Sequence, residues 1–338
     1  MDSVSQIALG AAVGVAVMGR RTAVWKAAAW GAVAGTLPDL DVFVRHGDPI
    51  LDMVLHRAES HALFWLTLFS LPFAAAVARL HGQWPLLRRW WLAIWLALVT
   101  HPLLDTLTVY GTQLGLPFTD RPYGVGSVFI VDPLFTVPLL VGTVWALCMR
   151  GRGNGLRANG IGLALGTAYL AWGVAAQHHV TQVAHGTLAA QGIVAERVLV
   201  TPTALNSVLW RVVAMSKDGY REGFYSLLDD RAHIAFDRFD RGTALEAGIA
   251  GIDGARRIAA FSRGFYRVKE DAAGRVRIVD LRMGMEPTYS FDFAVAERRD
   301  GAWVPLAPTV LLGGRPDVGA VLSWQWKRAL GEPVAPPR

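Results

Sequence analysis

The sequence predicts a polytopic α-helical membrane domain of about six segments, followed by a small α+β domain outside the membrane. Apolar residues make up 53% of the 338 residues and charged residues only 18%, whereas about a quarter of a typical soluble protein is charged. The apolar excess lies before about His178, where long apolar runs alternate with short polar clusters. Beyond it, no apolar stretch is long enough to span a bilayer. We therefore expect a membrane domain over residues 1–180 and an extramembrane domain over residues 181–338.

Six runs are candidate membrane segments: Ser3–Gly19, Ala23–Leu37, His61–Leu80, Trp90–Val109, Val128–Met149 and Gly160–His178. The last four approach the roughly 20 residues that a crossing helix needs. The first two are short, so each is a crossing helix, a buried helix of a bundle or a re-entrant element.

The connections between these segments differ in charge. Cations gather in alternate connections, at Arg20, Arg21 and Lys26, then Arg79, Arg88 and Arg89, then Arg150, Arg152 and Arg157. Alternate connections lie on one side of a membrane, and the positive-inside rule makes that side cytoplasmic. The connections Pro38–Ser60 and Tyr110–Ser127 should then face outward. An even number of crossings would put both termini, and with them the second domain, outside as well.

After about Val180 the sequence has the β-branched and aromatic enrichment of strands, separated by Gly and Asp turns. The predicted strands are Arg197–Val200, Ser207–Met215, Gly264–Val268, Val276–Leu281, Tyr289–Ala296 and Trp303–Pro305. We expect a helix over Asp229–Ile249 and disorder in the Pro-rich tail after Glu332. The single cysteine, Cys148, excludes an intrachain disulfide and a cysteine-rich zinc site.

The formal net charge is +6, but the cations occur in small scattered groups rather than on one long stripe. Nucleic acid is therefore not an expected partner. Membrane lipids are expected partners, and the sequence does not define the oligomeric state.

Two aspartates follow the second segment. Pro38 should stop or kink that helix, which leaves Asp39 and Asp41 at its outer end. Carboxylates in this position either cap a turn or bind a cation.

Two histidines precede the third segment. Ser60 is the predicted N-cap, which places His61 in the first helical turn and His56 on the loop before it. A single histidine here would be read as structural, but two histidines beside Glu59 at a membrane boundary favour a functional site.

The fourth segment carries His101 and Asp105, four residues apart on one helical face. A carboxylate inside a membrane helix costs about 2.5–3.5 kcal/mol on insertion scales, so it needs a cationic partner. That partner is a metal ion or a protonated histidine, the second of which would make the pair purely structural. Thr108 lies near Asp105 on the same helix, close enough to orient this residue through a hydrogen bond.

The loop after the fourth segment, from Tyr110 to Asp132, contains Arg121. This guanidinium either binds an anion such as a phosphate or extends to the membrane interface.

These stretches all mark outer ends of segments, so the predicted topology brings them together. Imidazole and carboxylate ligands without thiolates suit zinc, with manganese or iron as alternatives. The candidate ligands exceed what one tetrahedral ion needs, so one or two ions are expected. They are Asp39, Asp41, His56, His61, His101 and Asp105.

Over roughly its first 140 residues the chain resembles the YdjM/YbcI-type family of bacterial inner-membrane proteins, described as metal-dependent hydrolases. The resemblance rests on Met1-Asp2-Ser3 with Gln6, Gly35–Asp41, His56-Arg57 with Ser60-His61, Thr100–Asp105, and Tyr110-Gly111-Thr112 with Pro117-Phe118. Some relatives have a histidine at the position of Gln6. The resemblance implies a metal-dependent hydrolase in the bacterial inner membrane.

The sequence thus leads to three functional hypotheses. The first is a hydrolase of a phosphoester or lipid-type substrate at the outer face of the inner membrane, with Glu59 as general base and Arg57 and Arg121 near the substrate. The second is a metal or ion transporter, because ionisable residues in membranes also mark ion paths. The third is a non-catalytic membrane scaffold with a structural metal.

Overall fold

The computed structural model describes residues 1–150, 152–314 and 317–338, and Gly151 of the basic Arg150–Arg157 connection lies outside them. The chain forms two compact units. The helical unit comprises residues 1–44, 56–174 and 204–206, and the sheet unit comprises residues 45–55, 175–203 and 207–338. The boundary falls inside one long helix, at residues 174 and 175, close to the predicted position near residue 180.

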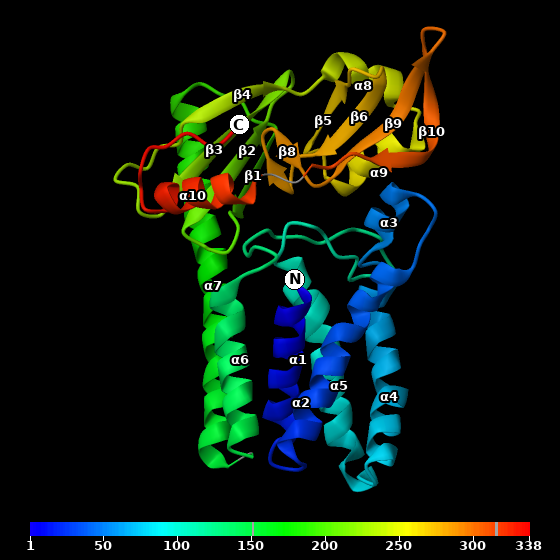
Figure 1. The fold of residues 1–338 in the computed structure, drawn as a ribbon, viewed down its shortest axis with the longest axis vertical. Helices are drawn as coiled ribbons and strands as arrows, with labels where there is room; N and C mark the ends of the chain where they lie inside the picture. Colours follow the sequence, from blue (N-terminus) through cyan, green and yellow to red (C-terminus); the bar gives the residue numbers. More distant parts are fainter. Residues whose placement is uncertain (151, 315–316) are drawn as a thin grey trace. The chain divides into compact units, whose positions relative to one another are not determined.

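Helices account for all six predicted segments. They are α1 (Ser3–Met18), α2 (Val24–Thr36), α4 (Leu63–Leu80), α5 (Leu87–Thr106), α6 (Pro133–Cys148) and α7 (Gly153–Ala190), which Figure 1 shows. Among the described residues, only α4 is both long and apolar enough to cross a membrane, while α1 and α6 are apolar but shorter. The helical half is therefore confirmed, and the six crossings stay a prediction.

Glycines bring α1 and α2 into backbone contact. A Cβ atom on Gly10 would lie 2.3 Å from the carbonyl oxygen of Gly31, and one on Gly35 would lie 2.7 Å from that of Gln6. Small residues allow such close approach, a common device between membrane helices. This contact fixes Gln6 and Gly35 beside each other at one end of the helix pair, where both contribute to the site described below.

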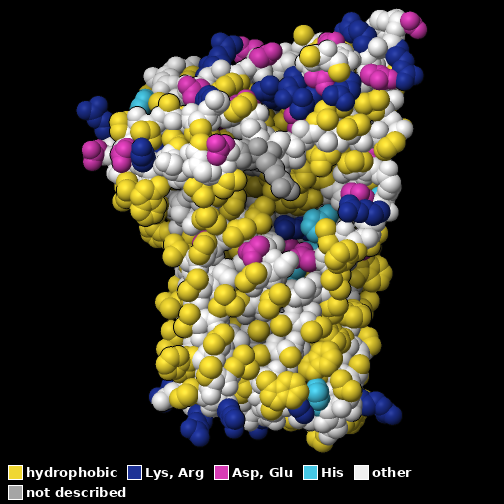
Figure 2. Space-filling model, viewed as in Figure 1, with side chains coloured by type: hydrophobic (Ala, Val, Ile, Leu, Met, Phe, Trp, Pro, Cys, Tyr) yellow, Lys and Arg dark blue, Asp and Glu magenta, His cyan; other side chains and the backbone are white. Residues whose placement is uncertain are grey.

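The outer faces of the helical unit are apolar. Exposed large side chains on α4 include Phe64, Trp65, Leu68, Phe69 and Leu71, and those on α6 include Leu134, Val137, Val141, Val144 and Trp145. Figure 2 shows hydrophobic side chains over most of the visible face of this unit, with Lys and Arg side chains gathered at its lower end. This distribution is typical of a surface in contact with lipid.

The sheet unit contains two antiparallel four-stranded sheets with the orders β1-β2-β3-β4 and β10-β9-β6-β5. The first contains β1 (Arg197–Pro202), β2 (Leu209–Met215), β3 (Gly219–Ser226) and β4 (Phe236–Asp240). The second contains β5 (Tyr266–Glu270), β6 (Arg275–Asp280), β9 (Asp292–Arg299) and β10 (Ala302–Leu311), and the pair β7 (Gly284–Met285) and β8 (Thr288–Tyr289) is separate. The α+β prediction for this half is confirmed.

Two predictions for this unit are wrong in detail. The stretch Asp229–Ile249, predicted to be one helix, contains β4 and then the short helix α8 (Thr243–Ile249), because residues 236–240 pair with β3. The Pro-rich tail, predicted to be disordered, has specific contacts. Val334 accepts a hydrogen bond of 3.1 Å from the Trp324 indole of α10 (Val318–Ala329), and Arg338 pairs with Asp237 at 2.5 Å.

A helix from the first half of the sequence belongs to the sheet unit. It is α3 (Pro49–Leu55), which packs against α9 (Asp253–Phe261) and β10. Asp48 caps α3 and also accepts hydrogen bonds from the backbone amide of Thr309, at 2.8 Å, and from its hydroxyl, at 3.0 Å. Ile50 is fully buried, and its Cδ1 atom would lie 3.1 Å from a Cβ atom placed on Gly254.

Candidate metal centre

Three elements of the helical unit carry the site. The 3-10 helix η1 (Leu37–Phe43) continues directly from α2 and carries Asp39, while the single turn η2 (Glu59–His61) precedes α4 and carries His61. His101 and Asp105 lie near the end of α5. Their four-residue spacing places them on one face of that helix, as predicted.

Four side chains from these elements converge. Asp39, His61, His101 and Asp105 each offer one ligand atom, and these atoms all lie within 4.8 Å of one another. The Nε2 atoms of His61 and His101 are 3.1 Å apart. Asp105 Oδ2 lies 3.3 Å from His61 Nε2 and 3.4 Å from His101 Nε2, and Asp39 Oδ1 lies 3.5 Å and 3.4 Å from the same two atoms.

Hydrogen bonds behind the two imidazoles determine their tautomers. His101 Nδ1 is 2.6 Å from the carbonyl oxygen of Gly35, which only accepts, so Nδ1 carries the hydrogen. Ser60 Oγ donates to Asp41 Oδ2 at 2.6 Å and therefore accepts from His61 Nδ1, 2.8 Å away. In their neutral forms both rings thus direct an Nε2 lone pair toward the same point.

This arrangement fits a metal ion. Two imidazole lone pairs and two carboxylate oxygens face one another, and none of the four atoms brings a hydrogen when the rings are neutral. Asp105 Oδ2 is buried without a hydrogen-bond partner, although the Nε atom of Arg57 lies 3.4 Å away. His61, His101 and the Asp105 side chain are fully buried, and the Asp39 side chain is 17% exposed. Burying such hydrogen-bond acceptors costs free energy unless a cation takes the place of the water that they lose.

Asp41 and His56 lie outside this group of four. Asp41 accepts hydrogen bonds from the Ser60 hydroxyl, from the backbone amide of Arg57 at 3.0 Å, and from His56 Nδ1 at 2.7 Å when that atom carries a hydrogen. Asp41 therefore holds the turn that presents His61. The ligand roles predicted for Asp41 and His56 stay predictions, as do those of the four converging residues.

The two aspartates of η1 favour their ionised forms. Burial raises the pKa of Asp39, but His101 and His61, whose Nε2 atoms donate to Asp39 when the rings are protonated, outweigh burial and hold that pKa well below its ordinary value. Burial likewise raises the pKa of Asp41, and the hydrogen bonds from His56 and Ser60 lower it further than burial raises it. Both carboxylates are therefore available as anions at neutral pH.

The three residues predicted to act on substrate lie in different surroundings. Arg57 is buried, its guanidinium is 4.9 Å from the centre of the Tyr110 ring, and its Nη1 donates to Thr108 Oγ1 at 3.3 Å. Glu59 is exposed at the start of η2. Arg121 is exposed with its guanidinium 5.7 Å from the Tyr123 ring centre. Neither Glu59 nor Arg121 belongs to the group of four, and their catalytic roles stay predictions.

Several contacts to Asp105 have no clear signal in the sequence. Its Oδ1 atom accepts from the Met1 amino group and from Gln6 Nε2, the latter at 3.1 Å. Burial, together with the nearby Arg57 charge, lowers the pKa of the Met1 amine. Thr108 was expected behind Asp105, and its hydroxyl donates to the Asp105 carbonyl oxygen at 2.7 Å. With Oδ1 already bonded, only Oδ2 faces the two imidazoles.

Comparison with known proteins relates the first half of the chain to a family. A model of the YdjM inner membrane protein family matches residues 1–180, which include the whole converging group. Neither the curated proteins nor the solved structures gave a match.

Proposed function

The chain belongs to the YdjM inner membrane protein family, and from this and the converging His/Asp group we propose that it is a membrane-bound metal-dependent hydrolase. The observation that carries the proposal is the meeting of two imidazole Nε2 atoms and two carboxylate oxygens within 4.8 Å. The ligands would be Asp39, His61, His101 and Asp105. Nitrogen and oxygen donors suit zinc, manganese or iron, and zinc is the ion we propose first.

A bound divalent ion lowers the pKa of water and polarises a phosphoryl or carbonyl oxygen. The chain's own residues supply the remaining functions. Glu59 is an exposed carboxylate two residues before His61, and in this proposal it accepts the proton released during hydrolysis. Arg57 lies beside Asp105 and offers positive charge to an anionic substrate, with Arg121 as a second cation on the loop after α5. Asp41 keeps His61 in the tautomer that exposes its Nε2 lone pair.

We propose a phosphoester or lipid-type substrate and a multi-pass orientation with the site on the periplasmic side. Two observations support this orientation. Apolar side chains cover the outer faces of α4 and α6, and cations gather at one end of the helical unit while the His/Asp group lies at the end of α5 that follows its apolar stretch. The positive-inside rule then makes the cationic end cytoplasmic.

A structural metal in a non-catalytic scaffold is the second candidate. It is favoured by the number of converging ligands, because four protein ligands fill a tetrahedral zinc site, whereas catalytic zinc keeps a position for water. Coordination number therefore separates the two candidates.

The test is metal analysis of the purified full chain combined with a screen of phosphoester and lipid substrates. We expect a stoichiometric divalent ion and an activity that a chelator removes and the ion restores. X-ray absorption of the bound metal would show a fifth, non-protein ligand. A bound metal with only four protein ligands and no hydrolysis of any substrate would support the scaffold, and absence of a metal would overturn both.

A further inference from the structure

The amide side chain of Gln6 connects α1 to two residues of the converging group. Gln6 is buried, and its Nε2 atom donates to Asp105 Oδ1 at 3.1 Å and to the carbonyl oxygen of His101 at 3.2 Å. An amide nitrogen of this kind carries two hydrogens, so these two bonds use both of them. A carbonyl oxygen and an ionised carboxylate only accept, and the amide therefore has one orientation, with its nitrogen toward Asp105.

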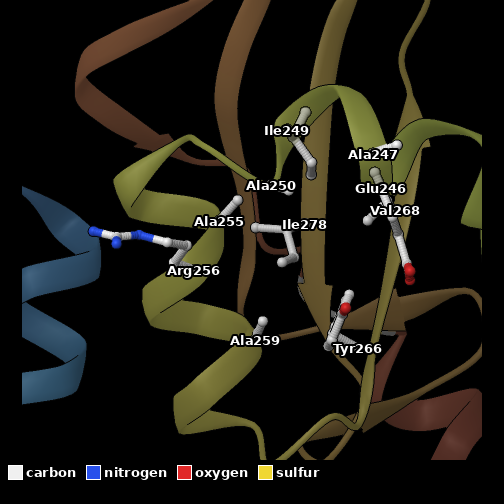
Figure 3. Close-up of a pocket in the computed structure, with 10 residues that line it drawn as sticks. All are labelled: Glu246, Ala247, Ile249, Ala250, Ala255, Arg256, Ala259, Tyr266, Val268 and Ile278. Carbon is white, nitrogen blue, oxygen red and sulfur yellow. The ribbon is translucent and has the colours of Figure 1, made fainter.

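This orientation leaves the oxygen of the Gln6 amide unpaired. Gln6 Oε1 is buried, and no described residue donates a hydrogen bond to it. Glu246 Oε1 and Arg241 Nε in the sheet unit also lack hydrogen bonds, but their opposite charges lie 3.1 Å apart and stabilise each other. Figure 3 shows Glu246 among the residues that line a hollow between α8, α9 and the second sheet. Gln6 Oε1 has no such compensation, and costs of this kind are expected at functional positions.

The close contact between α1 and α2 holds Gln6 in place. A Cβ atom on Gly35 would lie 2.7 Å from the carbonyl oxygen of Gln6, so the two backbones touch at this point. The carbonyl oxygen of Gly35 also accepts from His101 Nδ1 at 2.6 Å. One contact between helices thus fixes the group behind His101 and the group behind Asp105, and such groups orient metal ligands.

We propose that Gln6 is a positioning residue that restricts Asp105 to one metal-binding oxygen. Gln6 Nε2 and the Met1 amino group both donate to Asp105 Oδ1, which leaves Oδ2 for the ion. A carboxylate that binds through both oxygens fills one more coordination position, and a hydrolytic site keeps such a position for water. The inference rests on the proposed metal centre and explains how that centre stays open to water.

The first test compares zinc affinity with stability in the purified full chain. Gln6→Met removes the amide at a similar side-chain size, and it should weaken zinc binding about 10–100-fold in competition with a chelator. The unfolding temperature of the metal-free protein should stay about the same, because the loss of the unpaired oxygen offsets the lost bonds to Asp105 and His101. Ile7→Met, at an exposed position of the same helix, is the control and should match the wild type in both measurements. A lower unfolding temperature with unchanged affinity would make Gln6 purely structural.

Infrared spectroscopy tests the binding mode of Asp105 directly. The antisymmetric and symmetric stretching bands of a carboxylate lie further apart when one oxygen binds a metal than when both do. In spectra of the zinc-loaded minus the metal-free protein, with ¹³C-labelled aspartate to identify the bands, Gln6→Met should bring one pair of bands closer together. Ile7→Met should give the wild-type spectrum. Unchanged bands in a zinc-loaded Gln6→Met protein would overturn the proposal.

A double variant tests whether Gln6 acts through Asp105. In Asp105→Ala protein, whose weaker zinc affinity is measured at higher zinc concentration, Gln6→Met should cause no further loss. A further loss of tenfold or more would assign Gln6 to another ligand and overturn the proposal. A wild-type protein that binds no zinc would overturn the proposed metal centre and this inference together. None of these measurements uses hydrolysis, so a failure of the proposed activity remains distinguishable.

Discussion

His61 and His101 place their Nε2 atoms 3.1 Å apart, while the Nδ1 atom of each ring is held by a hydrogen bond from behind. Two neutral imidazoles cannot hydrogen-bond each other through two lone pairs. The pair therefore requires either a proton on one ring or a cation between the rings. The converging carboxylates of Asp39 and Asp105 stabilise either positive charge, and the following predictions distinguish the two states.

His101→Ala and Asp105→Ala should each lose most of the bound divalent ion, because each removes one ligand from a shared set of four. The ion is measured in the purified protein by mass spectrometry, with circular dichroism as the check on folding. His46→Ala is the matched control, since His46 is exposed in the sheet unit and should keep the wild-type content. Unchanged metal content in both folded variants would make His101 and Asp105 a structural pair.

Asp41→Asn should weaken metal binding about 10–100-fold without abolishing it, which is the usual effect of changing a group behind a metal ligand. An asparagine side chain accepts the Ser60 hydrogen bond less strongly, so His61 loses part of its tautomer preference. Competition with a chelator gives the affinity. A loss as complete as that in His101→Ala would instead identify Asp41 as a ligand.

Glu59→Gln should keep the metal and slow hydrolysis about 100-fold or more, because an amide does not accept a proton and general-base catalysis usually contributes that much. Rates and metal content are measured on the same preparation. If Glu59→Gln loses the ion, Glu59 is a ligand, and if it keeps full activity, another group is the base.

A reporter that is active only in the periplasm should be active when fused after Arg338 and silent when inserted in the Arg150–Arg157 connection. The expectation follows from the cations in three alternate connections. If α1 and α2 both fail to cross, the number of crossings falls by two, and the segments after α2 keep the same orientation. The opposite pattern of reporter activity would put the His/Asp group in the cytoplasm and remove the outer-face substrate.

Asp48→Asn should destabilise the docking of α3 by about 1–2 kcal/mol, because asparagine has one acceptor oxygen, whereas Asp48 accepts through Oδ2 from the Thr309 amide and through Oδ1 from the Thr309 hydroxyl and the Ile50 amide. Burial raises the pKa of Asp48, but hydrogen bonds from Thr309 outweigh it, so the folded pKa lies below the unfolded value. This stabilisation is therefore complete above about pH 4 and is lost as the pH falls through the lower folded pKa.

Amide hydrogen exchange of α3 and β10 measures this effect locally. Acidification should lower the protection of these amides in the wild-type protein, measured as the exchange rate relative to that of an unstructured peptide at the same pH. Asp48→Asn should be less protected at neutral pH and should change less with acid. Asp300→Asn, at an exposed turn of the same unit, is the control and should match the wild type. Equal acid responses in wild type and Asp48→Asn would contradict the role of the carboxylate.

The sequence was sufficient to bring Asp39, His61, His101 and Asp105 together, because helical periodicity and the ends of apolar runs are local signals. It could not separate Asp39 from Asp41. Pro38 predicted an end to the helix, whereas the chain continues as the 3-10 helix η1, in which residues two apart point in different directions. The bonds of Met1 and Gln6 to Asp105 arise from the packing of α1 on α2 and α5, which has no local signal.

In the second half, the strands with apolar sequences were predicted. The strands β3 and β4, which depend on pairing with neighbouring strands, were not. The strand β3 was not predicted, since its sequence contains two glycines with Arg221 and Glu222. Glu222 is fully buried there, and its carboxylate accepts from Arg211 Nε of β2 at 2.7 Å. The strand β4 was predicted as helix because its pairing with β3 depends on residues distant in sequence.

The helix α3 is synthesised long before the parts of the sheet unit against which it packs. Asp48 leaves the ribosome 261 residues before Thr309, its partner in the sheet unit. During that interval Ile50 and Met53 have no sheet to cover them, although both are buried in the finished protein. A fragment that starts at residue 181 would lack this helix and expose the surface of α9 and β10 that it covers. Supplying residues 45–55 as a separate peptide should cover that surface again, because the sheet unit is complete only with this segment from the first half of the sequence.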